Sequence, residues 1–254
     1  GIKLAKEGVE VNQFQNLDLN LLKNIFSRSD LGRRTFFEKE EIKKVGERIV
    51  LPDMADFLET LAIEGEDLFY RGEIGQQLVA DCQSGGGVLD MESLQSYHAA
   101  LKNPLETKFH GKQIFTMGYP SLGGPLLIYM LNRFSEQKSK SQFRSAEYMR
   151  DLSQILIEGK HLHENPELLY QIVKENHSAG DNRHGSTSHF NIIDKDNNAI
   201  ALTMTIGEGS GYFIPNTGIH MNNMLGEPGL LPDGINSWTP DARMRSMMSP
   251  TLIE

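Results

Sequence analysis

The sequence predicts an α+β protein with a mainly helical N-terminal part and a β-rich C-terminal part. Up to about residue 180, apolar residues recur at helical spacing between helix start and stop signals. From residue 187 the pattern changes to period-two alternation, followed by a stretch dense in glycine. A polar loop at 176–186 is the predicted boundary, so the two parts are residues 1–186 and 187–254.

Composition limits the classes of protein that the chain can belong to. The 254 residues are 39% hydrophobic and 23% charged, which is enough apolar material for a core. The formal net charge of −9 and the absence of basic stretches argue against binding to nucleic acid or anionic lipid. The single cysteine, Cys82, excludes an internal disulfide and a cysteine-based metal site. No apolar run is long enough to span a membrane.

Five segments of the N-terminal part carry helix signals. Apolar residues at helical spacing predict a helix that stops at Gly65. Asp90 is a suitable N-cap for a helix through Tyr97. Pro125 occupies a first-turn position, where its missing N–H costs nothing. The predicted helices are Leu51–Gly65, Glu73–Gln83, the segment from Asp90 to Tyr97, Leu126–Phe134 and Leu168–Lys174.

Two strand-like runs follow the polar loop, Thr187–Asp194 and Ala199–Ile206. The second run alternates apolar residues with small or polar ones, which indicates a strand with one apolar face. Its apolar residues are Ile200, Leu202, Met204 and Ile206. The glycine-dense stretch after it predicts loops with short strands.

The turn between the two runs decides which residues face each other. Residues 195–197 form a predicted hairpin turn, in which Asn197 can adopt a left-handed conformation. If this loop has three residues, Thr187 lies directly opposite Thr205. A slip of one residue would bring Ser188 to that position instead.

Other site patterns have weak support. The segment Gly207–Gly211 follows a strand, but it lacks the spacing of a nucleotide-binding loop or of a serine nucleophile turn. The eight histidines have no metal-ligand spacing, so solvated or hydrogen-bonded histidines are the better interpretation. A Ser-His-Asp triad stays open, because such triads are recognised by geometry; the local candidates are Asp181, His184, Ser186 and Ser188.

Thr187 is the remaining candidate nucleophile. It begins a strand directly after a flexible loop that ends at Ser186. Cleavage of the Ser186–Thr187 bond would give Thr187 both a hydroxyl nucleophile and a free α-amine, whose ordinary pKa of about 7.7–8.0 suits a general base. Thr205, on the facing strand, could hydrogen-bond the Thr187 hydroxyl. By pattern alone, however, a threonine at a strand start is usually only a β-former.

Six motifs, in one order along the chain, carry a resemblance to a known family. The three in the C-terminal part are Thr187–Asp194, Gly218–Asn223 and Ser246–Thr251, and the three upstream are Asp67–Gly72, Gly85–Leu89 and Tyr119–Gly124. Together they resemble the γ-glutamyltranspeptidases over nearly the whole chain. The resemblance implies the four-layer αββα fold of the N-terminal-nucleophile hydrolases, incomplete in this chain.

The resemblance also implies an activity. Members of this family cut their own precursor, here between Ser186 and Thr187, into a large and a small subunit that form a heterodimer. The new N-terminal Thr187 takes up a γ-glutamyl group, for example from glutathione, and passes it to water, an amino acid or a peptide. Thr205 matches the family's supporting threonine, Glu227 the acid that binds the α-amino group, and Ser246 a serine that holds the α-carboxylate. No cofactor and no metal are implied.

Three positions depart from the family pattern. Gly207 stands where the family commonly has an asparagine, Met224 replaces a polar residue, and Met247 replaces the second carboxylate-holding serine. Each departure removes a hydrogen-bond partner of the glutamyl head, and an unpaired buried charge is costly. A cephalosporin or glutaryl-type acylase of the same superfamily is therefore the alternative enzyme, and an unprocessed inactive segment is the non-enzymatic alternative.

The resemblance further implies parts of the site that this chain does not contain. They are the arginine that pairs with the α-carboxylate and the Gly-Gly pair of the oxyanion hole, whose loss alone typically costs about 10²–10³ in rate. We therefore expect the 254-residue chain by itself to stay uncut and inactive. The sequence leaves the compartment and the oligomeric state open, although the resemblance favours a periplasmic or secreted protein.

Overall fold

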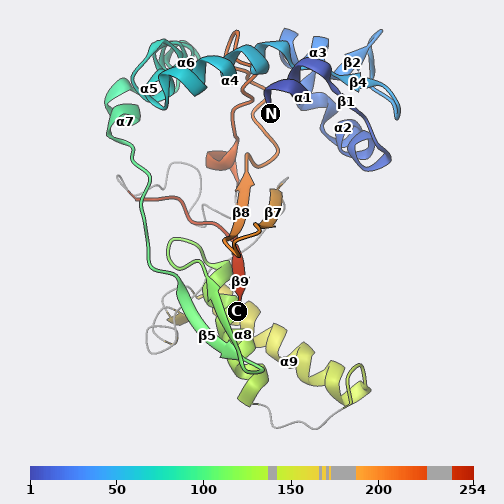
Figure 1. Ribbon diagram of the computed structural model, residues 1–254, viewed down its shortest axis with the longest axis vertical. Coiled ribbons are helices and arrows are strands. Elements are labelled where there is room, and N and C mark those ends of the chain that lie inside the picture. Colours follow the sequence, from blue (N-terminus) through green and yellow to red (C-terminus); the bar gives the residue numbers. More distant parts are fainter. Residues whose placement is uncertain (137–141, 166–167, 170–171, 173–186, 228–241) are drawn as a thin grey trace. The chain divides into compact units, whose positions relative to one another are not determined.

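The computed structural model describes residues 1–136, 142–165, 168–169, 172, 187–227 and 242–254, and its helices and small sheets confirm the predicted α+β class (Figure 1). Within these residues no helix is both long and apolar enough to cross a bilayer. The chain divides into two compact units, each built from residues on both sides of position 187. The first is Gly1–Ala100 with Glu208–Asn223, and the second is Leu101–Gly207 with Met224–Glu254.

The first unit is mainly helical. Its helices are α1 (Ile2–Glu7), α2 (Gln13–Phe26), α3 (Asp30–Phe36), α4 (Pro52–Glu64), α5 (Asp67–Tyr70), α6 (Glu73–Ser84) and α7 (Met91–Ser96). Two pairs of very short antiparallel strands accompany them, β1 (Val9–Glu10) with β4 (Arg48–Ile49) and β2 (Phe37–Glu38) with β3 (Glu41–Ile42).

Local signals set the ends of α4 and α7, and two of these signals, Gly65 and Asp90, are the ones that the sequence predicts. Pro52 occupies the first turn of α4, and Gly65 ends that helix with a φ of 72°, a value that favours glycine. The Asp90 side chain caps α7 by accepting a hydrogen bond from the backbone N–H of Ser93 at 2.8 Å. The predicted helices Leu51–Gly65, Glu73–Gln83 and the one after Asp90 are confirmed.

The segment Glu208–Asn223 supplies core residues to the first unit. Ile214, with 0% of its surface exposed, packs with apolar side chains of α5 and α6. Phe213 packs with apolar residues in and around α2, and the His220 ring stacks on it with centroids 4.3 Å apart. His220 Nε2 also accepts a hydrogen bond from the backbone N–H of Gly211 at 3.0 Å. Burial lowers the pKa of His220 below its ordinary value, so the neutral ring is the form that fits here.

The second unit contains a three-stranded antiparallel sheet, two long helices and a separate hairpin. The sheet has the order β5 (Leu105–Phe109), β6 (Lys112–Thr116) and β9 (Thr251–Ile253). The helices are α8 (Gly123–Glu136) and α9 (Ala146–His163), and a short 3-10 turn, η1, covers Met224–Gly226. The hairpin consists of β7 (Thr187–Ile193) and β8 (Ala199–Thr205).

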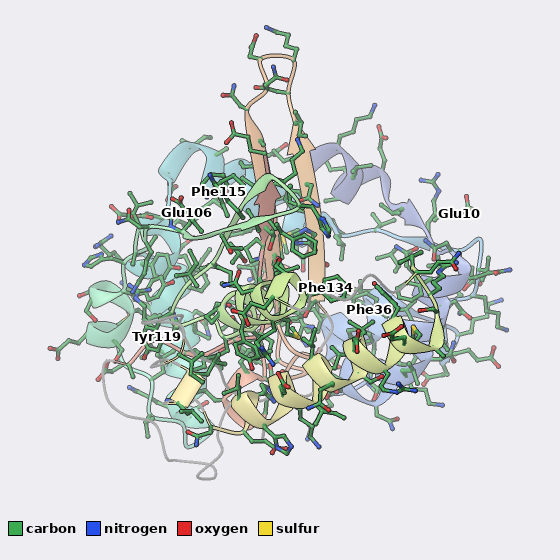
Figure 2. All side chains as sticks on the ribbon, turned by 90° about the horizontal axis from the view of Figure 1, so that it is seen from below. Glu10, Phe36, Glu106, Phe115, Tyr119 and Phe134 are labelled. Carbon is green, nitrogen blue, oxygen red and sulfur yellow. The ribbon has the colours of Figure 1, made fainter. Side chains whose placement is uncertain are left out.

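The hairpin of β5 and β6 is a feature that the prediction of a mostly helical stretch up to residue 180 missed. Glu106 and Phe115 face each other across it (Figure 2). Its turn is formed by His110 and Gly111, which both have positive φ, 49° and 81°. The third strand, β9, comes from the far end of the chain, so no pattern local to residues 105–116 indicates its pairing with β6.

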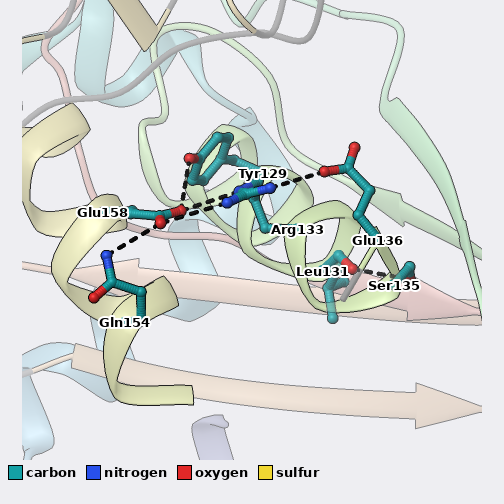
Figure 3. Close-up of polar contacts among 7 residues, drawn as sticks. All are labelled: Tyr129, Leu131, Arg133, Ser135, Glu136, Gln154 and Glu158. Atoms are coloured by element: carbon teal, nitrogen blue, oxygen red, sulfur yellow. Dashed lines mark hydrogen bonds and ion pairs between the residues drawn. The ribbon is translucent and has the colours of Figure 1, made fainter. Parts of the chain in front are cut away.

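Helices α8 and α9 are joined by a polar network (Figure 3), and Leu126 and Leu162 of the same two helices belong to one apolar cluster. Arg133 Nε donates to Glu158 Oε2 at 3.0 Å, and the Tyr129 hydroxyl donates to the same carboxylate at 3.3 Å. The hydrogen bond from Arg133 holds the pKa of Glu158 below its ordinary value. The predicted helix Leu126–Phe134 is confirmed inside α8, whereas most of the predicted helix Leu168–Lys174 lies outside the described residues.

Candidate active site around Thr187

The turn of the β7–β8 hairpin is fixed by its own side chains. Asp194 Oδ1 accepts hydrogen bonds from the backbone N–H groups of Asp196 at 2.8 Å and Asn198 at 2.9 Å. Hydrogen bonds from the Asn198 side chain and from these amides hold the pKa of Asp194 below its ordinary value. Asn197 has a φ of 63°, so it adopts the predicted left-handed conformation. The backbone N–H of Asp194 donates to the carbonyl of Asn198 at 3.0 Å, so these two residues face each other across a turn of three residues, 195–197, as the register argument required.

The register places the two candidate threonines opposite each other. Thr187 pairs with Thr205, and the slipped alternative is not adopted because Ser188 pairs with Met204. Thr187 is exposed, and Thr205 is half-buried. The Oγ1 atom of Thr205 accepts a hydrogen bond from the backbone N–H of Gly207 at 3.0 Å, which orients this hydroxyl at the end of the strand. Gly207 itself is buried and has a φ of 62°.

The hairpin has two chemically different faces, as the alternation predicts. Residues two apart on a strand share a face, so His189 lies on the same face as Thr187 and Thr205. The Nδ1 atom of His189 lies 2.7 Å from Oγ1 of Thr203, its direct partner on β8. Sequence reasoning did not single out His189, although the register alone would have found it. The apolar face carries Phe190, Ile192, Ile200, Leu202 and Met204, which are between 40% and 58% exposed.

Glu227 lies in the same compact unit as Thr187, directly after η1. Its backbone N–H donates to the carbonyl of Met224 at 3.2 Å, which closes the 3-10 turn. Met224 is buried, with 8% of its surface exposed, and Glu227 is half-buried. The carboxylate therefore does not sit in a fully solvated turn.

Ser246 lies against the segment that leads into α8. Ser121 and Ser246 form a parallel bridge, and the backbone N–H of Leu122 donates to the carbonyl of Ser246 at 2.8 Å. The hydroxyl of Ser121 donates to the carbonyl of Met248. The side chain of Met247 packs against the apolar cluster of α8 and α9. Met247, one of the three positions that depart from the expected family pattern, is thus a half-buried residue that packs on this cluster.

The structure brings some predicted site residues together and leaves others in separate surroundings. Thr187 and Thr205 are direct partners, whereas Glu227 and Ser246 are each held by other elements of the same unit. Ser186, Asp181 and His184 lie outside the described residues, and so does the predicted loop 176–186. Among the residues with described positions, no three His, Cys, Asp or Glu side chains gather closely enough to hold a metal ion.

Comparison with known proteins identifies relatives of this chain. It is 28% identical over 295 residues to the glutathione hydrolase proenzyme of Escherichia coli strain K12, covering 99% of this chain and 51% of that protein. It is 26% identical over 298 residues to glutathione hydrolase 2 of Arabidopsis thaliana, with coverages of 99% and 51%. The chain thus spans about half the length of the curated relatives it matches.

A solved structure and a family profile complete the comparison. The cephalosporin acylase from Bacillus halodurans matches with a TM-score of 0.76 at 21% identity, over 99% of this chain and 52% of that one. At this identity the likeness concerns the fold alone, and it is in keeping with the expected α+β class. The profile of the gamma-glutamyltranspeptidase family matches residues 1–158 and 134–254, which together cover the chain from end to end. The chain therefore belongs to the gamma-glutamyltranspeptidase family.

Proposed function

We propose that the protein is a γ-glutamyltranspeptidase-like enzyme whose nucleophile is Thr187, set free by self-cleavage of the Ser186–Thr187 bond. The observation that supports this most is the pairing of Thr187 with Thr205 at the end of the β7–β8 ladder. Two hydroxyls on facing strands are held by regular backbone rather than by a loop, which is what a precisely oriented nucleophile needs. The E. coli relative carries the name of a proenzyme, which is in keeping with a precursor that must be cut.

Self-cleavage and turnover use the same oxygen atom. In the precursor, Thr187 Oγ attacks the carbonyl carbon of Ser186, the peptide C–N bond breaks, and water hydrolyses the resulting ester. In the mature enzyme, the α-amine of Thr187 takes the hydroxyl proton as Oγ attacks the γ-carbonyl of the substrate. The proton then goes to the leaving amine, and water or an acceptor amine attacks the acyl ester.

Thr205 supports both steps in this proposal. Its oxygen already accepts a hydrogen bond from Gly207, so its own proton can be donated toward the Thr187 oxygen. Such a donor lowers the energy of the alkoxide-like oxygen that develops during attack. The role needs the two residues to stay in register, and the turn at Asp194 fixes that register.

The glutamyl head of the substrate would be recognised by two other residues. Glu227 would pair with the α-ammonium group, and Ser246 would donate to the α-carboxylate. The proposed acyl donor is a γ-glutamyl compound such as glutathione, and the acceptor is water, an amino acid or a peptide. These assignments follow the family motif, and the half-buried setting of Glu227 supports them.

The two parts of the cut chain would remain one molecule, a heterodimer of residues 1–186 and 187–254. Strand β9, from the second part, pairs with β6 from the first. Phe213 and Ile214, also from the second part, are buried in the core of the first unit. Cleavage at position 187 breaks none of these contacts.

A glutaryl-type acylase is the second candidate function, and Gly207 favours it. Gly207 has no side chain to meet an α-ammonium group. The glutaryl group carries no such charge, so it would lose less at this position than a γ-glutamyl group would. Both acyl groups keep the carboxylate, to which the Met247 side chain, packed in the apolar cluster of α8 and α9, offers no hydrogen bond.

Steady-state kinetics on two anilide substrates distinguish the two candidate functions of this protein. γ-Glutamyl and glutaryl anilides differ only in the α-amino group, and the protein expressed at full length is expected to prefer the γ-glutamyl compound. Preference for the glutaryl compound would favour the acylase. Thr187→Ala is expected to abolish turnover of both, and residual turnover by this variant would contradict the proposed nucleophile.

A further inference from the structure

We propose that Ser121 is a positioning residue that holds Ser246 in place for the α-carboxylate of the substrate. The inference rests on the proposed function, in which Ser246 binds that carboxylate. Ser121 lies in the motif Tyr119–Gly124, and its own role in that motif follows from its contacts in this structure.

Backbone and side-chain contacts tie the two segments together. Ser121 and Ser246 form a parallel bridge, and the N–H of Leu122 donates to the Ser246 carbonyl at 2.8 Å. The Ser121 hydroxyl donates to the carbonyl of Met248. The backbone is therefore held by hydrogen bonds at the carbonyl of Ser246 and at the carbonyl of Met248, two residues later. This leaves little freedom for the position of the Ser246 side chain.

The hydroxyl of Ser121 is well suited to this task because it is buried. Ser121 is 2% exposed, so water cannot replace its hydrogen bond to Met248. The next residue but one, Gly123, has no room for a side chain, since a Cβ there would lie 2.1 Å from the carbonyl oxygen of Met247. The two segments are thus in direct backbone contact, and a change at Ser121 is transmitted to residues 246–248.

Met247 and Ser246, which are neighbours in the held segment 246–248, lie in different environments. Met247 packs against the apolar cluster of α8 and α9, which anchors the segment on one side. Ser246, its neighbour, stays half-buried. Because Met247 replaces the family's second serine, Ser246 would carry the carboxylate without a neighbouring hydroxyl. Its exact position then matters more than in a site with two serines.

The test uses three anilides and the protein expressed at full length. γ-Glutamyl anilide has both head groups, glutaryl anilide has only the carboxylate, and 4-aminobutanoyl anilide has only the amine. Ser121→Ala is expected to raise KM about tenfold for the first two with kcat nearly unchanged, because a binding contact is lost in ground state and transition state alike. The third substrate is expected to be unaffected. Ser121→Cys, which keeps a weak donor of similar size, is expected to recover part of the loss.

A matched control separates positioning from general stability. Thr107→Val also removes a hydroxyl that donates a hydrogen bond in the same unit, to Asn132 at 2.7 Å, and this partner lies on α8 rather than in residues 246–248. Thr107→Val is expected to leave the ratios of the KM values for the three anilides unchanged. An equal loss on all three substrates with Ser121→Ala, or no change on any, would overturn the inference. If Ser121→Ala does not fold, the ratios of the KM values for the three anilides are measured on Ser121→Cys and judged in the same way.

Hydrogen exchange gives a readout that does not depend on activity. The amide of Leu122 donates to the Ser246 carbonyl, so it is expected to exchange faster in Ser121→Ala than in the wild type. An unchanged exchange rate of the Leu122 amide would show that the Ser121 hydroxyl does not hold residues 246–248 in place. A wild-type protein that turns over none of the three anilides would instead contradict the proposed function, and the two failures are therefore distinguishable.

Discussion

Thr187 lies directly opposite Thr205 in the antiparallel ladder of β7 and β8. The relationship is fixed from two sides. At one end, the Asp194 side chain holds a three-residue turn through two backbone amides. At the other end, the N–H of Gly207 donates to Thr205 Oγ1. A shift of one residue would move every side chain of one strand to the opposite face of the hairpin, so this turn also controls the candidate active site.

Loss of the Thr205 hydroxyl tests this relationship. Thr205→Val keeps the shape of the side chain but removes both the acceptor for Gly207 N–H and the donor toward Thr187. In the protein expressed at full length, we expect the rates of self-cleavage and of substrate turnover to fall together by about ten- to hundredfold. This is the effect of one lost hydrogen bond in a partly buried site. Thr205→Ser is expected to retain most of both rates. The measurement is the rate of appearance of the cut chain on a denaturing gel, together with anilide hydrolysis.

Thr203→Val is the matched control for this variant. Thr203 lies two residues away on the same face of β8 and contacts His189 rather than Thr187. It is expected to leave the rate of self-cleavage close to that of the wild type. If Thr205→Val cuts itself and turns over substrate at wild-type rates, Thr205 has no part in the chemistry.

Glu227 is expected to be the partner of the substrate ammonium group. Removing one member of a buried ion pair typically costs about 3–5 kcal/mol, on the order of 10²–10³ in affinity. Glu227→Gln is therefore expected to raise KM steeply for γ-glutamyl anilide and far less for glutaryl anilide. Self-cleavage, which binds no such amine, is expected to be nearly unaffected. The exposed Glu208 provides the control, since Glu208→Gln is expected to change neither KM. If the ratio of the KM values for γ-glutamyl and glutaryl anilide is the same in Glu227→Gln as in the wild type, Glu227 does not bind the ammonium group.

The stability of the first unit is expected to depend on pH through His220. Its pKa in the folded state is lowered by burial, so the unfolded state binds the proton more readily when the pH falls below about 6.5. Stability is therefore expected to decrease as the pH falls from about 6.5 toward the folded pKa, and to be unaffected by this group above that range. His220→Gln, which can still accept from Gly211, is expected to flatten this part of the curve. The measurement is the Tm of both proteins across this pH range, and parallel curves would show that His220 does not titrate on unfolding.

The parts of the structure that depend on local signals could be predicted from the sequence. The hairpin needed only the alternation of β8, a turn containing Asn197, and the assumption of a three-residue loop. The end of α4 and the start of α7 followed from Gly65 and Asp90 in the same way. In each case the residues that decide the structure lie within a few positions of one another, so neighbouring side chains carry the whole signal.

The parts that depend on distant partners could not be predicted in this way. The sheet of β5, β6 and β9 joins Thr116 to Thr251, whose hydroxyl oxygens lie 3.0 Å apart although the residues are 135 positions apart in the sequence. The contact of Ser121 with Ser246 has the same origin. Met247 could be recognised as a departure from the family pattern, but that its side chain packs into the cluster of α8 and α9 emerges only from the fold.

The N-terminal sequence of the smaller piece of the protein, expressed at full length, tests the role of Thr187 most directly. We predict that the wild type yields a piece that begins Thr-Ser-His, that Thr187→Ser yields less of it, and that Thr187→Ala stays a single chain. Intact-mass spectrometry of the same samples gives the extent of the cut. A piece that begins at any other residue, or a Thr187→Ala protein that still cuts itself, would contradict the assignment of Thr187 as the N-terminal nucleophile.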